Sequence, residues 1–405
     1  MKKPELMAPA GDWTMLRAVV KAGANAVYFG TDQLNMRAKA KNFQIENLPE
    51  VVKFCKSHNV KTYLTINTII YENEVDQAFE LIAKAKSAGI DMIICWDLSI
   101  IELCNKLNMP FAVSTQASIS NSVSAEMYKK LGAKRVVLAR ECHLDDVKKI
   151  KSKVDIEVEA FIHGAMCIAV SGRCFMSHYM FDKSANRGEC IQPCRREYEI
   201  IDKSTDKSMV IGEDYVLSPE DLCSIEFIDQ LIESGIDSFK IEGRKRSPEY
   251  AAKVVSVYRK AIDFYFEQKL TVEIKKELLD ELDEVYNRGF SNGFYFGLPG
   301  KEDYAGIYGS KATTRKEFIG RVTNYFKKPK VAEIKIETGK LSLGDKIYFI
   351  GETTGVVELQ IMNILFEDKP VEQVEKGNIF TVPCKELVRP RDSVYVVKKL
   401  EKTVS

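Results

Sequence analysis

The sequence predicts an α/β protein built on a closed barrel of eight parallel strands with helices between them. Three observations support this fold: a repeated glycine-containing pattern, eight short apolar runs, and amphipathic stretches between most of these runs. The repeat occupies residues 22–28, 88–94, 131–137 and 234–240, where a glycine precedes an apolar run. A glycine in the left-handed conformation commonly ends a helix, and continuous apolar runs are typical of strands buried on both faces.

The eight apolar runs alternate with helical periodicity, which is the order that a β/α barrel requires. They lie near Leu6, Val27, Leu64, Ile93, Val113, Val137, Val158 and Phe239. We therefore expect residues 1–247 to form an eight-stranded β/α (TIM-like) barrel. The stretch 164–219, which follows the seventh run, is too long for a simple connection, and long loops of this kind are usually functional.

The rest of the chain is predicted to form two further parts. Helical patterning covers residues 248–268 and 270–287, so we expect 248–315 to be a helical extension and linker. From about Phe318 the pattern alternates with a period of two, and glycines mark the turns. Residues 316–405 should therefore form a small antiparallel β-barrel with almost no helix.

This C-terminal region also interleaves basic and aromatic side chains. They are Arg315, Lys316, Arg321, Lys327, Lys328 and Lys330 with Phe318, Tyr325 and Phe326. The mixture suits contacts with phosphates and stacking on bases, which predicts a surface that binds RNA. Charged hairpins on any small barrel have a similar composition, so an ordinary solvated surface is the alternative interpretation.

Composition predicts a cytoplasmic protein. The 59 basic and 58 acidic side chains nearly cancel, so any nucleic-acid partner must be held by a local patch. Residues 1–9 lack the apolar run of a secretory signal, and no apolar stretch approaches the roughly 20 residues that span a bilayer. We expect no membrane segment, and the ten cysteines should be reduced thiols.

Five of these cysteines are scattered through apolar patterns and are expected to be buried: Cys55, Cys95, Cys104, Cys142 and Cys384. Four others, at Cys167, Cys174, Cys190 and Cys194, fall within 28 residues. Thiolates select iron–sulfur clusters or zinc, and the spacing does not match the paired cysteines of zinc ribbons. We expect an iron–sulfur centre, with zinc as the second choice. Polar neighbours disfavour a third reading, in which these thiols are only buried core residues.

A cubane cluster needs four thiolates. We expect Cys223 to join Cys167, Cys174 and Cys190, because it begins the helix before the eighth strand and can return to the barrel mouth; Cys194 is the alternative fourth ligand. If the metal is zinc, His178 could replace a cysteine.

Reactive side chains are expected at the carboxyl ends of the barrel strands. His163 ends the seventh strand and is a candidate proton donor or hydrogen-bond partner of a sulfur, with structural capping as the alternative. Glu242 and Arg244 end the eighth strand, where they are predicted either to act on an anion or to form a salt bridge at the rim. His58 and His143 are expected at the surface.

Side chains from other loops should meet at the same mouth. Arg37, Arg140 and Arg173 would add guanidinium groups to that of Arg244, and Gln116 follows the fifth strand. Several guanidiniums together offer bidentate contacts to a dicarboxylate or to an RNA phosphate. The sequence therefore predicts a binding site for an anionic substrate.

The cysteine-bearing stretch resembles the signature of a known family. Residues 159–177 contain the elements Glu-x-Phe-x-x-Gly-Ala-Met-Cys and Gly-x-Cys-x-x-Ser, which look like those of the collagenase-like peptidase family U-32. Further segments that resemble the family are 35–38, 114–118, 192–195, 221–223, 240–244 and 288–297. The resemblance covers essentially the whole chain, and its last 80 residues are similar to the C-terminal domain of one branch.

The resemblance implies an oxygen-independent hydroxylation protein with a 4Fe-4S cluster. Branches of the family act on ubiquinone precursors, on ribosomal RNA or on the wobble uridine of tRNA. This chain is most similar to the branch that forms 5-hydroxyuridine in tRNA. The resemblance therefore implies tRNA as the substrate, prephenate as a small anionic hydroxyl donor, and a protein of the same family as a candidate partner.

Two other functions stay open. The family name suggests a peptidase of unassigned mechanism, although no His-Glu-x-x-His helix occurs and the chain has only four histidines. The third candidate is a non-catalytic RNA-binding or scaffold subunit that needs a partner to become active.

Overall fold

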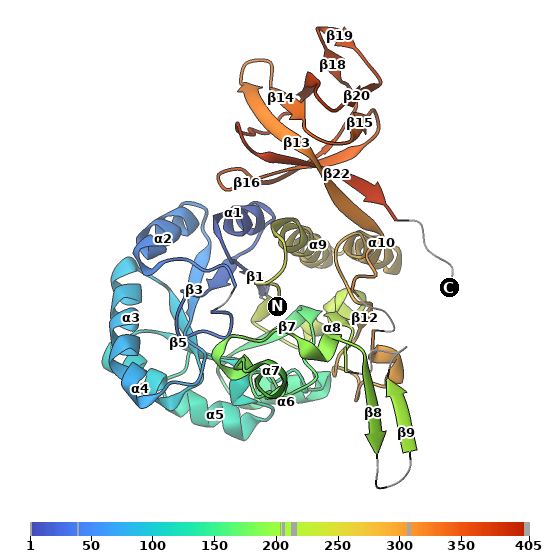
Figure 1. Cartoon of the computed structure of the whole chain (residues 1–405). Coiled ribbons are helices and arrows are strands. Elements are labelled where there is room, and N and C mark those ends of the chain that lie inside the picture. Colours follow the sequence, from blue (N-terminus) through green and yellow to red (C-terminus); the bar gives the residue numbers. More distant parts are fainter. Residues whose placement is uncertain are drawn as a thin grey trace.

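The computed structural model describes residues 2–38, 40–202, 204, 207–211, 217–305 and 309–400. It shows a barrel ringed by helices, with a second, smaller β-structure attached to one side (Figure 1). None of the helices in these ranges combines the length and the apolar composition that crossing a lipid bilayer requires.

Eight parallel strands close the barrel, as the sequence predicts. In chain order they are β1 (Glu5–Pro9), β2 (Ala26–Phe29), β3 (Lys61–Thr65), β4 (Met92–Cys95), β5 (Phe111–Val113), β6 (Arg135–Val137), β7 (Glu157–Ala165) and β11 (Ser238–Ile241). Each strand pairs in parallel with the next, and β11 closes the ring by pairing with both β7 and β1. All eight strands contain the residues around which the sequence places them.

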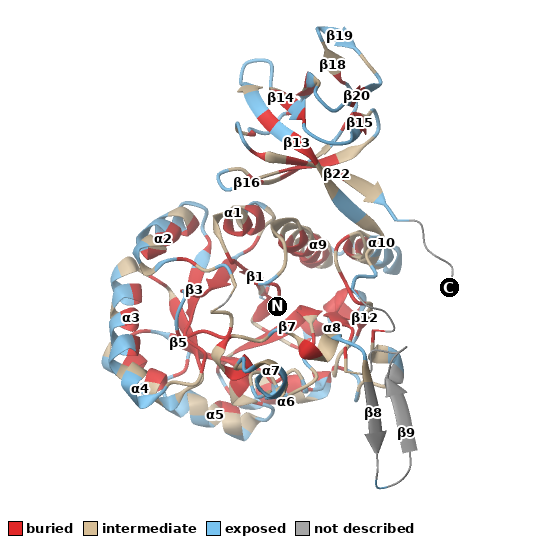
Figure 2. Cartoon of the chain, in the orientation of Figure 1, coloured by how far each residue is buried: buried red, intermediate tan, exposed pale blue. Residues whose placement is uncertain are grey.

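Helices cover the outside of the barrel. They are α1 (Trp13–Lys21), α2 (Leu48–Ser57), α3 (Val75–Ala88), α4 (Leu98–Lys106), α5 (Ser122–Lys130), α6 (Leu144–Lys153), α8 (Ile228–Glu233) and α9 (Pro248–Phe266). Local signals set their ends: Asp12 caps α1 by accepting a hydrogen bond from the Met15 amide at 2.8 Å, and Gly89 ends α3 with a φ of 84°. Their inner faces are buried and their outer faces are exposed (Figure 2).

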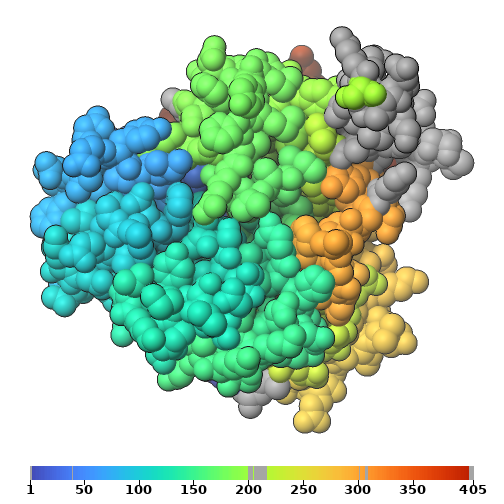
Figure 3. Space-filling view, turned by 90° about the horizontal axis from the view of Figure 1, so that it is seen from below, coloured from blue at the N-terminus to red at the C-terminus, as the bar shows by residue number. Residues whose placement is uncertain are grey.

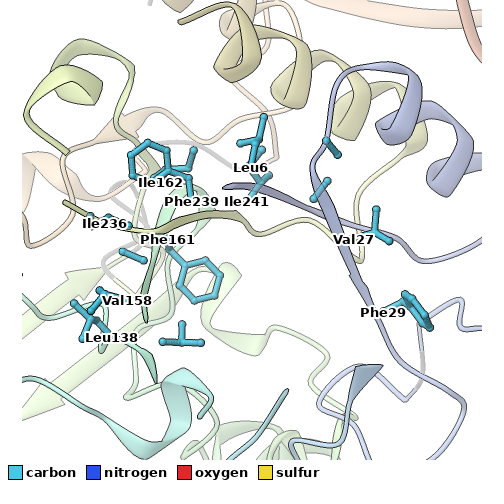
Figure 4. Packing of buried hydrophobic residues seen from close by; sticks show 14 of the residues in the cluster. Leu6, Val27, Phe29, Leu138, Val158, Phe161, Ile162, Ile236, Phe239 and Ile241 are labelled. Atoms are coloured by element: carbon cyan, nitrogen blue, oxygen red, sulfur yellow. The ribbon is translucent and has the colours of Figure 1, made fainter. Parts of the chain in front are cut away.

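The main core lies between the strands and these helices. Outward-facing strand residues supply it, and Figure 4 shows Leu6, Ile162 and Phe239 packed close together. Inward-facing residues form a separate cluster in the barrel, which includes Met7, Tyr28 and Tyr63. The period of two along each strand decides which residue joins which cluster.

A buried ion cluster lies in the barrel interior near the amino ends of the strands. Arg135, which is 2% exposed, contacts Glu5 at 2.7 Å, Glu159 at 3.1 Å and Glu157 at 2.8 Å. The ammonium group of Lys240 contacts Glu159 at 2.8 Å. Because a buried charge is costly unless it is paired, this cluster ties strands β1, β6, β7 and β11 to one another.

The long segment after β7 folds back against the barrel. It contains α7 (Met176–Phe181), the hairpin β8 (Tyr198–Asp202) and β9 (Lys207–Ile211), and β10 (Asp221–Cys223). Strand β10 runs antiparallel to β7, and β12 (Phe290–Ser291) pairs with β10, so one wall of the barrel continues outward. The second predicted helix is α10 (Val272–Asp283), shorter than expected at both ends.

The C-terminal part is an antiparallel β-structure, as expected, and it contains no helix in its described residues 314–400. Its strands are β13 (Thr314–Phe326), β14 (Val331–Ile336), β15 (Lys340–Ser342), β16 (Lys346–Gly351), β17 (Gly355–Gln360), β18 (Leu365–Phe366), β19 (Lys369–Pro370), β20 (Gln373–Glu375), β21 (Ile379–Pro383) and β22 (Ser393–Lys399). It has a hydrophobic core of its own. It contacts the barrel at α1 and α9 through β17, and through ion pairs such as Lys346–Glu284 at 3.0 Å.

Candidate active site at the barrel mouth

A cavity of about 150 Å³ lies at the carboxyl ends of the barrel strands, beneath the cysteine-bearing segment. It gathers side chains from the strand ends on one side and from that segment on the other. Nine residues predicted from the sequence line it: Arg37, Gln116, Arg140, Cys167, Cys174, Cys190, Cys194, Glu242 and Arg244. The cavity therefore unites the expected thiols and the expected guanidiniums in one place.

Specific contacts hold the cysteine-bearing segment over the mouth. The Thr68 hydroxyl donates to the Asn186 carbonyl at 3.0 Å, and Arg187 contacts Glu74 at 3.0 Å. Gly188 has a φ of 88°, and a Cβ there would lie 2.5 Å from the carbonyl oxygen of Asn35. Only glycine allows the segment to approach the loop after β2 so closely.

Glu242 is the acid at the centre of the basic side chains. Its carboxylate contacts the Arg37 guanidinium at 3.3 Å. Burial alone would raise the pKa of Glu242, but Arg37, Arg140 and Arg244 outweigh it and hold the pKa below its ordinary value. Glu242 is therefore ionised at neutral pH. The alternative that the sequence left open, a salt bridge between Glu242 and Arg244, does not form, and Glu242 pairs with Arg37 instead.

Arg244 is only 5% exposed, and neutral groups hold it. It donates to the Asn35 side-chain oxygen at 3.1 Å and to the Thr65 hydroxyl at 3.2 Å. It makes no ion pair among the residues that the structure describes. Burial lowers the pKa of Arg244 to about 10, so the group stays charged at neutral pH.

Arg140 completes the basic side of the cavity. Its guanidinium lies over the Phe161 ring, 4.0 Å from the centroid, and donates to the Ser171 hydroxyl. Three guanidiniums thus surround the single carboxylate of Glu242. The resulting excess of positive charge in a largely buried space suits an anionic ligand.

Two residues that the sequence reasoning missed also line this cavity: Tyr28 and Lys240. The Tyr28 hydroxyl donates to the Ile241 carbonyl at 2.9 Å, and burial raises the pKa of Tyr28, so its phenol stays protonated. Both residues occupy inward positions on their strands. Strand alternation applied to β2 and β11 would have identified them.

The four clustered thiols line the same cavity. Cys167 is exposed, and Cys174, Cys190 and Cys194 are half-buried. Burial raises the pKa of Cys174, and it raises that of Cys194 to about 11, so both are thiols in the free protein. The Cys174 amide donates to the Asn186 side chain at 2.9 Å, which fixes the turn that carries this thiol.

The donor set fits a thiolate-bound metal centre, because four soft ligands face one cavity. In the described part of the chain, however, no three Cys, His, Asp or Glu side chains converge into a group that could hold a metal ion as they stand. Binding would therefore have to draw the cysteine-bearing segment together. Such coupling between metal binding and folding is common for cysteine sites.

Cys223, the expected fourth ligand, does not line this cavity, and Cys194 does. Cys223 is 4% exposed on β10, where its sulfur lies 3.7 Å from the Tyr258 hydroxyl. The sequence places Cys223 at the start of a helix, but it belongs to a strand that pairs with β7 outside the barrel mouth. The geometry thus favours the alternative ligand.

His163 also lies outside the cavity. Its ring packs between Tyr258 and Phe290, at centroid distances of 5.5 and 5.6 Å. The reason is a bulge in β7: Phe161 pairs with Lys240, whereas the next β11 residue, Ile241, pairs with His163. A one-residue slip reverses the face to which a side chain points. Burial lowers the pKa of His163 to about 3, so it is neutral and has no imidazolium proton to donate.

Arg173 lies beside the cavity without lining it. It donates to the Gln116 carbonyl at 3.2 Å and lies over the Trp96 ring at 5.7 Å, so it supports the wall that Gln116 forms. The five scattered cysteines are all buried, as predicted. His178, the alternative zinc ligand, is on α7 but does not line the cavity.

The family model of peptidase family U32 matches residues 11–305 of this chain. Among similar proteins, an uncharacterized protease of Methanocaldococcus jannaschii is 42% identical over 98% of both chains. A collagenase of Porphyromonas gingivalis is 39% identical over 98% of both chains. A tRNA hydroxylation protein P1 of Bacillus subtilis is 40% identical over 86% of this chain and 84% of its own.

These matches extend over the strands, the clustered cysteines and the loops that form the cavity. The family model alone covers well over half of the chain. The chain therefore belongs to peptidase family U32, a family with a tRNA hydroxylation branch.

Proposed function

We propose that this protein hydroxylates the wobble uridine of tRNA to 5-hydroxyuridine, with a 4Fe-4S cluster and a small dianion such as prephenate as the hydroxyl donor. One observation carries the proposal: buried guanidiniums in excess of carboxylates and four thiols line the same cavity. A hydroxylation site of this kind must hold an anionic donor next to a metal centre. The relative named as a tRNA hydroxylation protein supports RNA as the acceptor.

The basic side of the cavity would bind and orient the donor. Arg140 and Arg244 make no ion pair with a carboxylate among the described residues. Each guanidinium can therefore donate hydrogen bonds to a carboxylate of the ligand. Glu242 holds Arg37 in place. Its own negative charge limits the additional negative charge of a ligand that the guanidiniums can balance. Tyr28 adds a neutral hydroxyl whose proton is already donated to the Ile241 carbonyl, so its oxygen could accept a hydrogen bond from the bound ligand.

The thiol side would hold the cluster through Cys167, Cys174, Cys190 and Cys194. A bound cluster supplies electron-transfer or Lewis-acid chemistry at the donor. A base inside a folded anticodon must leave its stack to reach such a cavity.

A peptidase is the second candidate, because one relative is named a collagenase. Residues 289–293 match the Gly-x-Ser-x-Gly pattern of serine hydrolases. Ser291, however, lies on β12 rather than on a strand-to-helix turn, and its hydroxyl accepts the Gly293 amide at 3.3 Å. None of the four histidines lines the cavity. The site geometry therefore favours hydroxylation.

Mass spectrometry of tRNA nucleosides from cells lacking this protein tests the proposal. We expect hydroxyuridine to disappear and to return when the wild-type chain is expressed. Unchanged wobble uridines would refute tRNA hydroxylation, and cleavage of a collagen-like peptide by the pure protein would then favour the peptidase. Loss of the modification that returns only when a second protein is supplied would favour the scaffold subunit.

Arg37→Ala, Arg140→Ala and Arg244→Ala should each keep iron and lower hydroxyuridine formation. Losing one buried charge-assisted contact to an anion costs about 2–5 kcal/mol. A variant impaired in donor binding should recover when excess donor is supplied, whereas a variant impaired in RNA binding should recover when the salt concentration is lowered. Lys130→Gln, on the outer end of α5, removes one exposed charge and serves as the matched control. Wild-type modification in all three arginine variants would contradict the assigned role of the cavity.

A further inference from the structure

A second cavity, of about 300 Å³, lies beside the first. It is formed between the end of the cysteine-bearing segment and the segment that follows α10. Its principal lining residues are Arg195, Arg196, Arg288 and Tyr286. Figure 3 shows the two segments side by side on one face of the molecule, the first in green and the second in orange.

The charges around this second cavity are unbalanced. Arg288 is 6% exposed and contacts Asp221 at 3.1 Å, but the same carboxylate also contacts Arg246 at 3.2 Å. No acidic residue is among the described residues that line the cavity. The one carboxylate of Asp221 therefore pairs with two guanidiniums, and Arg195 and Arg196 add two further positive charges.

Arg195 is held entirely by neutral oxygens. One of its terminal nitrogens donates to the Ser218 hydroxyl at 2.9 Å and to the Pro219 carbonyl at 2.7 Å, and the other donates to the Met166 carbonyl. Its Nε is buried and has no hydrogen-bond partner. A buried donor without a partner is costly, so the protein alone does not satisfy the Arg195 guanidinium completely.

Tyr286 gives the cavity a rigid aromatic wall. Its ring packs under two guanidiniums, with Arg246 at 4.0 Å and Arg288 at 5.3 Å from the centroid, and its hydroxyl donates to the Gly309 carbonyl at 3.1 Å. Guanidiniums stacked on a ring keep their planar donor edges free. The stacked guanidiniums of Arg246 and Arg288 are therefore fixed in orientation before any ligand binds.

The two cavities share Arg195, which lines both. A ligand that spans them would place one group against the thiols and the guanidiniums of the first cavity and an anionic group among the arginines of the second. A nucleotide has this shape, since its base and its phosphate lie on opposite sides of the sugar. Phosphate contacts usually set the register of a nucleic acid, while other contacts read the base.

We propose that the second cavity binds a backbone phosphate next to the nucleotide whose base enters the first cavity. Arginine clusters recognise phosphate by bidentate hydrogen bonds, and three arginines around one space suit its several oxygens. The assignment to RNA rests on the proposed function. The binding of a polynucleotide phosphate at this place does not depend on turnover.

The test is the binding of a fluorescent oligouridylate to the iron-containing full chain, measured by anisotropy over a range of salt concentrations. Arg196→Gln and Arg288→Gln should each weaken binding by about tenfold and lower the slope of log affinity against log salt by about one unit. Lys130→Gln should leave both quantities unchanged. Arg196 is exposed, so its variant should keep the iron content and the melting temperature of the wild type.

Salt slopes that are equal in the wild type and in Arg196→Gln would overturn the proposal, as would a failure of the oligouridylate to bind the wild-type chain. Arg288→Gln can also lose stability, because it leaves Asp221 with one partner fewer, and for this reason Arg196→Gln decides the outcome. Failure of the proposed function would appear elsewhere, as unchanged wobble uridines in cells lacking the protein.

Discussion

Individual side chains in this structure divide into those that stabilise the barrel and those that can act on a ligand. Glu5 belongs to the first group: its carboxylate contacts Arg135 and Lys61, and these cations outweigh burial and lower the pKa of Glu5. Arg244 belongs to the second group, since its charge is buried without a carboxylate partner among the described residues.

Glu5→Gln should destabilise the protein by about 3 kcal/mol at pH 7, because it breaks a buried ion pair. A carboxylate whose folded pKa is lowered stabilises the fold above its unfolded pKa, and this contribution is lost as the pH falls through the folded pKa. The difference between the variant and the wild type should therefore shrink below about pH 4. Urea unfolding at several pH values measures it. A difference that is the same at pH 7 and pH 3 would contradict this account.

Cysteine substitutions test the metal centre residue by residue. Replacing Cys167, Cys174, Cys190 or Cys194 by alanine should remove iron and lower stability together, because a shared centre ties the long segment to the barrel. Cys223→Ala should keep iron and lose stability through a small packing defect of about 1–2 kcal/mol. Iron analysis of anaerobically prepared variants measures this. Iron loss in Cys223→Ala with full iron in Cys194→Ala would restore the assignment made from the sequence.

At the scale of secondary structure, the ends of β7 and β11 decide which groups reach the cavity. Gly164, near the end of β7, has a φ of 111°, and a Cβ there would lie 2.6 Å from the Glu242 carbonyl oxygen. The strand ends meet this closely only because the residue is glycine. The bulge at Ile162 then turns His163 away from the cavity.

Gly164→Ala should separate the two strand ends and displace Glu242. The expected loss of stability is about 1–3 kcal/mol, because both the conformation and the close contact disfavour a side chain. Gly377→Ala is the matched control: its φ is also positive, at 95°, but a Cβ there meets nothing within 4 Å. Thermal melting of both variants measures the difference. Equal destabilisation would show that conformation alone, without the contact, accounts for the loss.

The sequence predicts strands well here and predicts the orientation of their side chains less well. Apolar runs locate all eight barrel strands, because strands buried on both faces have a distinct composition. A bulge leaves no such signal, so the direction of His163 could not be foreseen. Cys223 was misplaced because Asp221–Cys223 is too short to show a strand pattern. The cysteine cluster was found because thiols at close spacing are rare in reduced chains.

For the whole molecule, the barrel and the C-terminal β-structure have separate hydrophobic cores. They meet where β17 packs on α1 and α9, and through ion pairs such as Lys316–Glu249 at 2.6 Å and Lys253–Glu358 at 3.6 Å. Pairs of this kind contribute about 0–1 kcal/mol each. Each part should therefore fold largely by its own packing.

A chain that ends at Thr313, immediately before β13, should form a folded barrel that binds iron. It should lose affinity for tRNA if the basic and aromatic side chains of β13 contact RNA, as the sequence suggests. Iron content, melting temperature and tRNA binding of the truncated chain measure both effects. Insoluble or iron-free protein would show that the C-terminal part is integral to the barrel fold.

The buried ion cluster around Arg135 lies toward the amino ends of the barrel strands, whereas the cavity lies at their carboxyl ends, and Lys240 belongs to both. Apart from Lys240, mutations that loosen the ring and mutations that change the chemistry therefore fall on different residues. A lineage can replace the loops at the mouth while the salt-bridged end continues to secure the scaffold. Such a separation lets the mouth change with little effect on the scaffold, which fits a family whose members carry the names of both protein-cleaving and RNA-modifying activities.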